Sequence, residues 1–163
     1  MKLDRLDLKI IDILQRDGRI TNLELAEKVG LSPTPCLNRV KKMEAAGIIS
    51  GYAAIIDPIA AGYEICAFIL VQINNHTRKA GDEFAAAVSK SPAIVEYNMI
   101  SGKLDYLLRV YARNLSHYEV ILQDQISELP HIASLESLFV LNTSSQPRMK
   151  LSLENSPLLQ PKR

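Results

Sequence analysis

The chain has 163 residues, a formal net charge of +1 and 47% hydrophobic residues, which suffices for one domain with a full core or for two small ones. No apolar run approaches the roughly 20 residues of a membrane span, and acidic residues within the first ten positions exclude a signal-peptide core. Two cysteines, far apart and in apolar contexts, indicate buried thiols in a reducing cytoplasm, the three histidines lack metal-ligand spacing, and we expect no metal and no cofactor.

Two helices are predicted in the first 30 residues. Apolar side chains recur at helical spacing over residues 4–16, so we expect an amphipathic helix whose start Asp4 or Asp7 can cap. The run Thr21–Glu24 is a capping box, which opens a second, shorter helix that continues through Val29.

A third helix is predicted between Ser32 and Gly47. Ser32 is the expected N-cap, Pro33 occupies the first helical position, and Gly47 supplies a left-handed stop. One side of this helix is apolar and carries Cys36, Leu37, Val40 and Met43. The opposite side and its flank carry small, polar and cationic residues: Thr34, Pro35, Asn38, Arg39, Lys41, Lys42 and Ala45. A cationic helix face is, by itself, most often only a solvated surface.

The second and third helices are joined by a three-residue turn that begins at Gly30, and this is a helix-turn-helix pattern. Residues 28–43 hold four cations and no acid, and the outward side of the third helix offers the amide, hydroxyl and cationic groups that a DNA major groove requires. A plain three-helix bundle is the alternative. The predicted DNA-binding residues are Ser32, with Thr34, Pro35 and Asn38 for base edges, and Arg39, Lys41 and Lys42 for phosphates.

The rest of the chain predicts a linking strand followed by alternating strands and helices. β-prone residues over 48–56 predict a strand that ends at Asp57-Pro58, and residues 58–62 form the expected domain boundary. Further strands are predicted at 65–74, 95–99, 106–110 and 135–141, with one helix that starts at Asp82 and one that starts at a capping box from Ser116 to Glu119 and ends at Pro130. This order is the ferredoxin-like split βαβ arrangement.

The predicted fold class is therefore α+β. We expect a winged-type helix-turn-helix of three helices at 1–50, a linker strand at 51–62, a ferredoxin-like βαββαβ domain at 63–142 and a loosely held tail at 143–163. The βαββαβ arrangement leaves one sheet face without helices, and the apolar first strand indicates that this face pairs with another chain. A homodimer would place two reading helices on a two-fold axis, which matches two DNA half-sites.

The sequence resembles the Lrp/AsnC family of transcription regulators over about residues 3–142. The resemblance is carried by LDRLDLKIIDILQRDGRITNLELAEKVGLSPTPCLNRVKKMEAAGIISGYAAIIDP and by SGKLDYLLRV, and SPTPCLNRVKKME resembles the leucine-responsive branch. It implies an N-terminal domain that binds double-stranded DNA and a C-terminal domain that dimerises and assembles into tetramers or octamers. It also implies a small-molecule effector, an amino acid such as leucine, and a cytoplasmic, nucleoid-associated location.

The resemblance further implies an effector loop made of Ser101, Gly102, Lys103, Leu104, Asp105 and Tyr106. Gly102 would let the backbone approach a ligand closely, and exposed amides of the turn can take a carboxylate. Asp105 can accept a hydrogen bond from a ligand ammonium, or it can order the turn. From the residues alone, the same stretch can be a simple hairpin. A segment that closes the pocket from a neighbouring subunit in some family members matches Leu135, Glu136 and Ser137.

The predicted function is that of a homo-oligomeric, amino-acid-responsive DNA-binding regulator. We do not expect an enzyme, because Asp105, Arg109 and His117 lack a recognisable catalytic spacing. The alternative is an architectural DNA-binding protein that binds without sequence preference and without an effector. Comparing binding to operator and random duplexes distinguishes these two functions.

Overall fold

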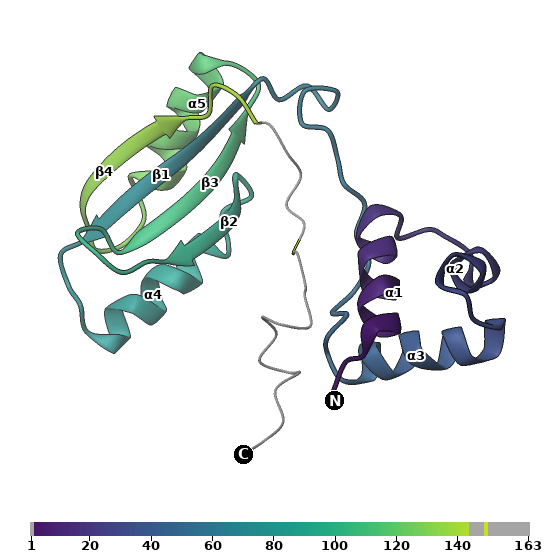
Figure 1. The fold of residues 1–163 in the computed structure, drawn as a ribbon. Coiled ribbons are helices and arrows are strands. Elements are labelled where there is room, and N and C mark those ends of the chain that lie inside the picture. The colour runs from purple at the N-terminus through teal and green to yellow at the C-terminus, as the bar shows by residue number, and fades with distance from the viewer. Residues whose placement is uncertain (1, 144–148, 150–163) are drawn as a thin grey trace. The chain divides into compact units, whose positions relative to one another are not determined.

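A computed structural model describes residues 2–143 and residue 149 of the chain, which belong to two compact units (Figure 1). The first unit contains the residues up to Ile55, and the second begins at Ile56. Within the described residues, no helix is long and apolar enough to cross a membrane, and no three His, Cys, Asp or Glu residues are grouped as a metal site requires. The predicted tail at 143–163 lies outside this part of the chain, except for residues 143 and 149.

The first unit contains the three predicted helices, α1 (Arg5–Arg16), α2 (Asn22–Val29) and α3 (Pro33–Ala45). Asp4 caps α1 by accepting hydrogen bonds from two backbone N–H groups. The predicted capping box at the start of α2 is present. Ser32 occupies the N-cap position of α3, but its side chain makes no capping hydrogen bond.

Helices α2 and α3 are each followed by a glycine in the left-handed backbone conformation. Gly30, the C-cap of α2, has φ 87°, and Gly47, just after α3, has φ 68°. A side chain with a Cβ atom is disfavoured in this region, so glycine allows the chain to leave the helix without strain. Both positions agree with the sequence prediction.

The core of the first unit forms where the apolar stripes of its three helices meet. Its fully buried side chains include Ile10 of α1 and Cys36 and Met43 of α3. Leu37 is 38% exposed, so its predicted place on the buried side is wrong. It directly follows Cys36 along the helix, which turns it about 100° away from the fully buried position.

The predicted strand at 48–56 is not formed. Residues 48–64 contain no strand, and Ile55 and Ile56 are both exposed. A strand requires a neighbour that accepts and donates its ladder hydrogen bonds. No described segment of this chain supplies that neighbour, so β-prone side chains alone did not produce a strand.

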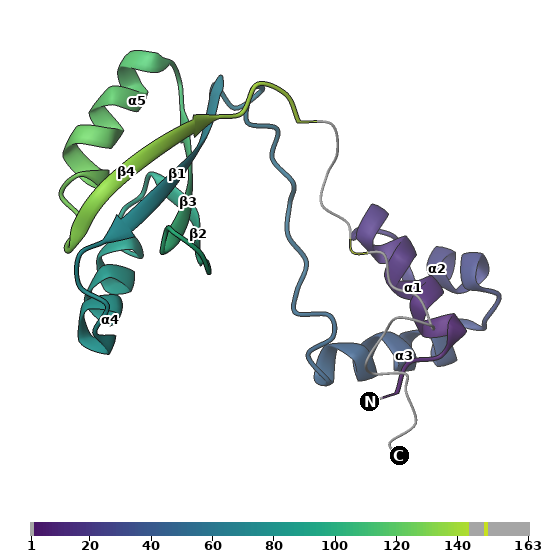
Figure 2. The same ribbon diagram turned by 60° about the vertical axis from the view of Figure 1, so that its left-hand side comes forward.

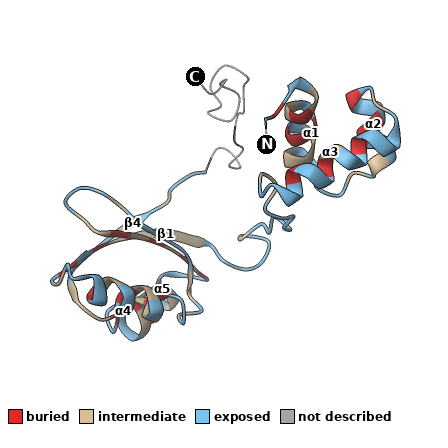
Figure 3. Ribbon diagram, turned by 90° about the horizontal axis from the view of Figure 1, so that it is seen from below, coloured by how far each residue is buried: buried red, intermediate tan, exposed pale blue. Residues whose placement is uncertain are grey.

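The second unit is a four-stranded antiparallel sheet with helices on one face, as Figures 2 and 3 show. Its strands, in the spatial order β2-β3-β1-β4, are β1 (Ile65–Ile73), β2 (Ile94–Met99), β3 (Tyr106–Ala112) and β4 (Ile132–Phe139). Its helices are α4 (Arg78–Val88) and α5 (Leu115–Ile121), and the π-helical turn η1 (Leu122–Ile126) continues from α5. The core lies between the sheet and the helices, which confirms the predicted ferredoxin-like arrangement.

Both helices of the second unit begin earlier than predicted. The N-cap of α4 is Thr77, whose side chain accepts from the backbone N–H of Ala80, so Asp82 lies inside the helix. The N-cap of α5 is Asn114, not Ser116, and it accepts from the backbone N–H of His117. Asn, Asp, Ser and Thr are all favoured at the N-cap position, so local chemistry alone does not select among neighbouring candidates.

The strands at the two edges of the sheet also differ from the prediction. Alternation of Val95, Tyr97 and Met99 with polar residues predicts a half-buried strand, but all three side chains of β2 are exposed. The register shifts between Ile94 and Glu96, and β2 lies at the edge of the sheet, where it has only one neighbouring strand. Strand β4 begins at Ile132, three residues before the predicted start, because Ile132 pairs with the end of β1.

Candidate nucleic-acid interface and effector loop

Helix α3 has a buried side and an exposed side, and six of the seven residues predicted to bind DNA are exposed on this helix or at its N-cap. Cys36, Val40 and Met43 pack into the core of the first unit. Among the described residues, Lys41 and Lys42 form no ion pair. The six exposed candidates are Ser32, Thr34, Pro35, Asn38, Lys41 and Lys42.

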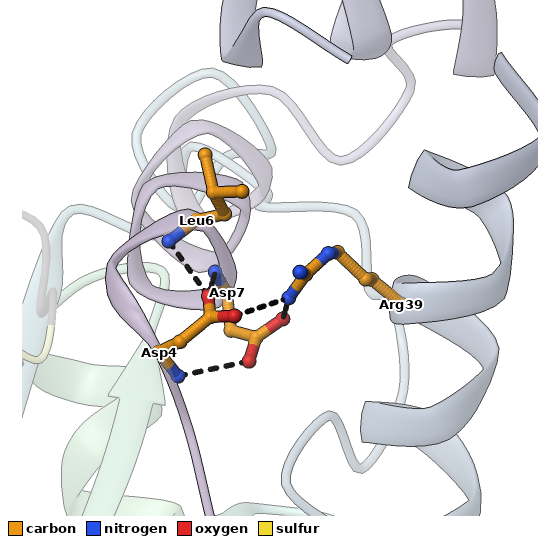
Figure 4. A network of polar contacts seen from close by, with 4 residues as sticks. All are labelled: Asp4, Leu6, Asp7 and Arg39. Atoms are coloured by element: carbon orange, nitrogen blue, oxygen red, sulfur yellow. Dashed lines mark hydrogen bonds and ion pairs between the residues drawn. The ribbon is translucent and has the colours of Figure 1, made fainter. Parts of the chain in front are cut away.

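The seventh candidate, Arg39, is bound to the start of α1 (Figure 4). Its Nη1 atom lies 2.7 Å from Asp4 Oδ2 and 2.7 Å from Asp7 Oδ1. The two acids are joined to each other, because the backbone N–H groups of Asp4 and Asp7 each donate to the other's carboxylate at 2.9 Å. Asp7 is 2% exposed and is the one buried charged residue among those described. Arg39 therefore fixes α3 against α1.

The charges of this network reinforce one another. The pKa of the Asp4 carboxyl is lowered, because it accepts from the backbone N–H of Asp7 and pairs with the Arg39 guanidinium. The pKa of Arg39 is raised by its hydrogen bonds to Asp7 and Asp4. Sequence reasoning identified the α1 cap but grouped Arg39 with the two lysines, because its partners lie 32 and 35 residues away along the chain.

A second polar contact joins the two helices on either side of the turn. The side-chain Nδ2 of Asn22, at the start of α2, donates to the backbone carbonyl of Pro33 at 2.9 Å. This bond spans eleven residues and connects the first residues of α2 and α3. Local sequence spacing carries no signal for this contact, because the acceptor is a backbone carbonyl eleven residues away.

The effector loop predicted from the family resemblance connects β2 to β3. The backbone N–H of Ile100 donates to the carbonyl of Asp105 at 2.9 Å and closes the hairpin. Gly102 has φ 133°, and residues 101–103 are exposed. Within the described part of the chain, the backbone N–H groups of residues 101–104 have no hydrogen-bond acceptor. Free amides at an exposed turn form a site for an anion.

Asp105 is held firmly by the neighbouring end of β1. Its Oδ2 accepts from the backbone N–H of Ile73 at 2.8 Å, its Oδ1 lies 3.1 Å from His76 Nε2, and its own backbone N–H donates to the Val71 carbonyl at 2.9 Å. Of its two predicted roles, these contacts support the one in which Asp105 orders the turn.

The remaining residues predicted from the resemblance do not gather at the exposed loop. Tyr106 is buried, with its ring 4.4 Å from the ring of Phe84 in α4, and burial is the main cause that raises its pKa. On β4, Ser137 accepts a hydrogen bond from the Tyr118 hydroxyl, and Leu135 packs against the core. Glu136, by contrast, is exposed. Within one chain, these residues do not form a pocket with residues 101–104.

Comparison with known proteins covers both units. A model of the winged helix-turn-helix DNA-binding domain matches residues 3–50, and one of the Lrp/AsnC ligand binding domain matches residues 66–149. The leucine-responsive regulatory protein of Rhizobium meliloti is 38% identical over 86% of this chain and 90% of its own length. That of Escherichia coli strain K12 is 37% identical, over 88% of each chain.

Solved structures agree with these matches. A transcriptional regulator from Neisseria meningitidis, solved in complex with L-Met, superposes with a TM-score of 0.83 at 37% identity and covers 88% of this chain and 93% of that one. An AsnC family transcriptional regulator from Agrobacterium tumefaciens gives a TM-score of 0.84 at 34% identity, with 93% and 98% coverage. This chain therefore belongs to the Lrp/AsnC family of DNA-binding transcriptional regulators.

Proposed function

We propose that this regulator binds specific DNA sites as a homo-oligomer and that an amino acid controls its assembly. It acts in the cytoplasm, where chromosomal DNA of the nucleoid is accessible. The observation that carries the proposal is the exposed side of α3, where amide, hydroxyl and ammonium groups stand together on a helix anchored by Arg39.

Two classes of contact follow from the chemistry of that side. Lys41 and Lys42 neutralise phosphates, which releases counterions and makes binding depend strongly on salt. Thr34, Pro35 and Asn38 contact base edges, and an Asn amide can pair with adenine through two hydrogen bonds. Arg39 keeps the helix in place and leaves phosphate contact chiefly to the lysines.

A pair of substitutions tests this division. Lys42→Ala should weaken binding to operator and random duplexes about equally and reduce the slope of log K against log salt by about one unit. Asn38→Ala should reduce affinity for the operator by about 1–3 kcal/mol and leave random DNA nearly unchanged. Lys90→Ala, at an exposed site in the second unit, is the control and should change neither affinity.

Fluorescence anisotropy titrations at several salt concentrations measure the affinity of each variant for the operator and for random DNA, and the salt slope of each. Equal losses on both duplexes for Asn38→Ala would contradict its role in base recognition. A wild-type protein that binds both duplexes with the same affinity, and whose affinity no amino acid changes, would favour the architectural alternative.

The effector part of the proposal rests on the hairpin between β2 and β3. Free backbone amides of residues 101–104 can bind a carboxylate, and Gly102 lets it approach closely. The Neisseria meningitidis relative was solved with L-Met, which suggests an amino acid, with leucine or methionine as the first candidates here. Glu136 and Ser137 would complete the site only from a neighbouring subunit.

A thermal-shift screen of the twenty amino acids identifies the effector, because a ligand specific for the folded state raises the melting temperature. Asp105→Ala should abolish the shift for that amino acid, since the turn loses its hydrogen bond to the backbone N–H of Ile73. Lys90→Ala again serves as the control. A normal response in Asp105→Ala would refute the assignment of this loop.

The oligomer part rests on the sheet face that carries no helix (Figure 3). Phe68 of β1 lies there opposite Leu138 of β4, which is 45% exposed, and beneath the Arg109 guanidinium at 5.1 Å. A second copy would bury this face in a dimer, and dimers would assemble further into tetramers or octamers. Light scattering tests this: Leu138→Asp should lower the oligomer mass, and a monomeric wild type would contradict the proposal.

A further inference from the structure

A cavity lies in the βαββαβ unit, away from the effector loop. Its volume is about 470 Å³, within the range of pockets that hold small ligands. It includes Tyr111 near the end of β3, whereas the effector loop ends at Tyr106, the first residue of that strand. Five residues of strand separate these tyrosines by roughly 17 Å, so the cavity and the loop are distinct sites.

Two hydrogen-bond donors on α5 and η1 line the cavity. Nδ1 of His117 accepts from the backbone N–H of Arg113 at 3.1 Å, so the neutral ring carries its hydrogen on Nε2. Oε1 of Gln125 accepts from the Ser91 hydroxyl at 2.8 Å, which orients the amide and leaves its NH₂ group as a donor. Neither His117 Nε2 nor Gln125 Nε2 has a partner among the described residues.

Ile121 lies between these two donors along the helix and completes the same cavity wall. Tyr111 supplies a third polar group, and burial, together with the neighbouring Cys66, raises the pKa of its hydroxyl. A tyrosine hydroxyl is protonated at neutral pH, so this group can donate a hydrogen bond. The wall combines neutral donors with apolar surface.

The rest of the lining is apolar apart from the hydroxyl of Tyr63, and it contains no acidic residue, lysine or arginine. Ile56, Pro58, Pro92, Ala93 and Val95 contribute apolar surface to the cavity. Neutral donors in apolar surroundings satisfy a carboxylate or a carbonyl oxygen, whereas a phosphate dianion would lack a compensating cation. An α-ammonium group would lack a carboxylate partner for the same reason.

We propose that this cavity binds a small carboxylate that has a branched apolar tail and no ammonium group, such as a 2-oxo acid. The carboxylate and oxo oxygens accept from His117, Gln125 and Tyr111, and the tail packs against Ile121 and Val95. This class differs from the amino acids proposed for the effector loop by the one group that the cavity cannot pair.

Titration calorimetry of the full chain tests the proposal with 4-methyl-2-oxopentanoate and leucine, which share a carbon skeleton. The wild type should bind the oxo acid at this cavity. Gln125→Leu and His117→Phe should each weaken that binding about tenfold, the effect of one lost hydrogen bond of about 1.4 kcal/mol. Gln123→Leu, an exposed position on the same helical segment outside the cavity lining, is the matched control and should bind normally.

The side-chain signals of His117, followed by NMR, distinguish the two sites. Asp105→Ala should lose the amino-acid response and still bind the oxo acid with an unchanged shift of the His117 ring, so failure of one site leaves the other testable. Oxo-acid binding that survives Gln125→Leu and His117→Phe would overturn the inference. So would the absence of both heat and ring shift at millimolar ligand, whether the cavity stays empty or a second copy closes it.

Discussion

Replacing Asp7 by Asn tests the contact that anchors the recognition helix. The carboxylate of Asp7 is buried and accepts from Arg39 Nη1 and from the backbone N–H of Asp4. Asn has nearly the same shape and keeps one oxygen that can accept from Asp4. The substitution therefore removes the charge while leaving the volume and one hydrogen bond in place.

The expected loss follows from the remaining contacts. A hydrogen bond between charged groups contributes about 1.5–3 kcal/mol, and breaking a fully buried ion pair costs about 3–5 kcal/mol. Arg39 keeps its contact with Asp4, and its side chain is 30% exposed, so water and the second acid compensate for part of the loss. We expect Asp7→Asn to destabilise the first unit by about 2 kcal/mol.

Native-state hydrogen exchange measures this loss at the amides of α1 and α3, and urea denaturation measures it globally. Asp12→Asn is the matched control on the same helix, because Asp12 pairs with Arg16 at 2.8 Å while both side chains are more than half exposed. Such a pair contributes at most about 0.5 kcal/mol. Equal, small changes in both variants would refute the anchoring role of Asp7.

Two further predictions concern stability. The folded-state pKa of Asp4 lies below its ordinary value of 3.8. Its contribution to the free energy of unfolding is therefore complete above that value and is lost as the pH falls through the lower folded pKa. Asp4→Asn should reduce this acid-induced loss of stability in the first unit. Urea titrations at several low pH values that show the same loss of stability in the variant as in the wild type would contradict this. Phe84→Ala should cost the second unit about 3–5 kcal/mol, because the ring is fully buried against Tyr106. Val120→Ala, at a half-exposed site of α5, should cost far less. Urea titrations that give a similar loss of stability for Phe84→Ala and Val120→Ala would contradict the role of Phe84 in the core.

The amino-acid sequence by itself determined the features that depend on nearby residues. The three N-terminal helices, the capping box at Thr21 and the stop at Gly47 were predicted correctly, because caps and helical stripes act within a few positions. The βαββαβ order could also be predicted, since apolar residues recur at different spacings in strands and in helices. The outward side of α3 followed from the same periodicity.

Only the tertiary structure decided which distant groups meet. It paired Arg39 with Asp7, turned Tyr106 into the core, and left the β-prone run 48–56 without a strand partner. Each of these outcomes depends on the packing of segments far apart in sequence, or on a neighbour that the segment itself does not contain. Local spacing carries no signal for such contacts, because their energies arise only after the chain has folded.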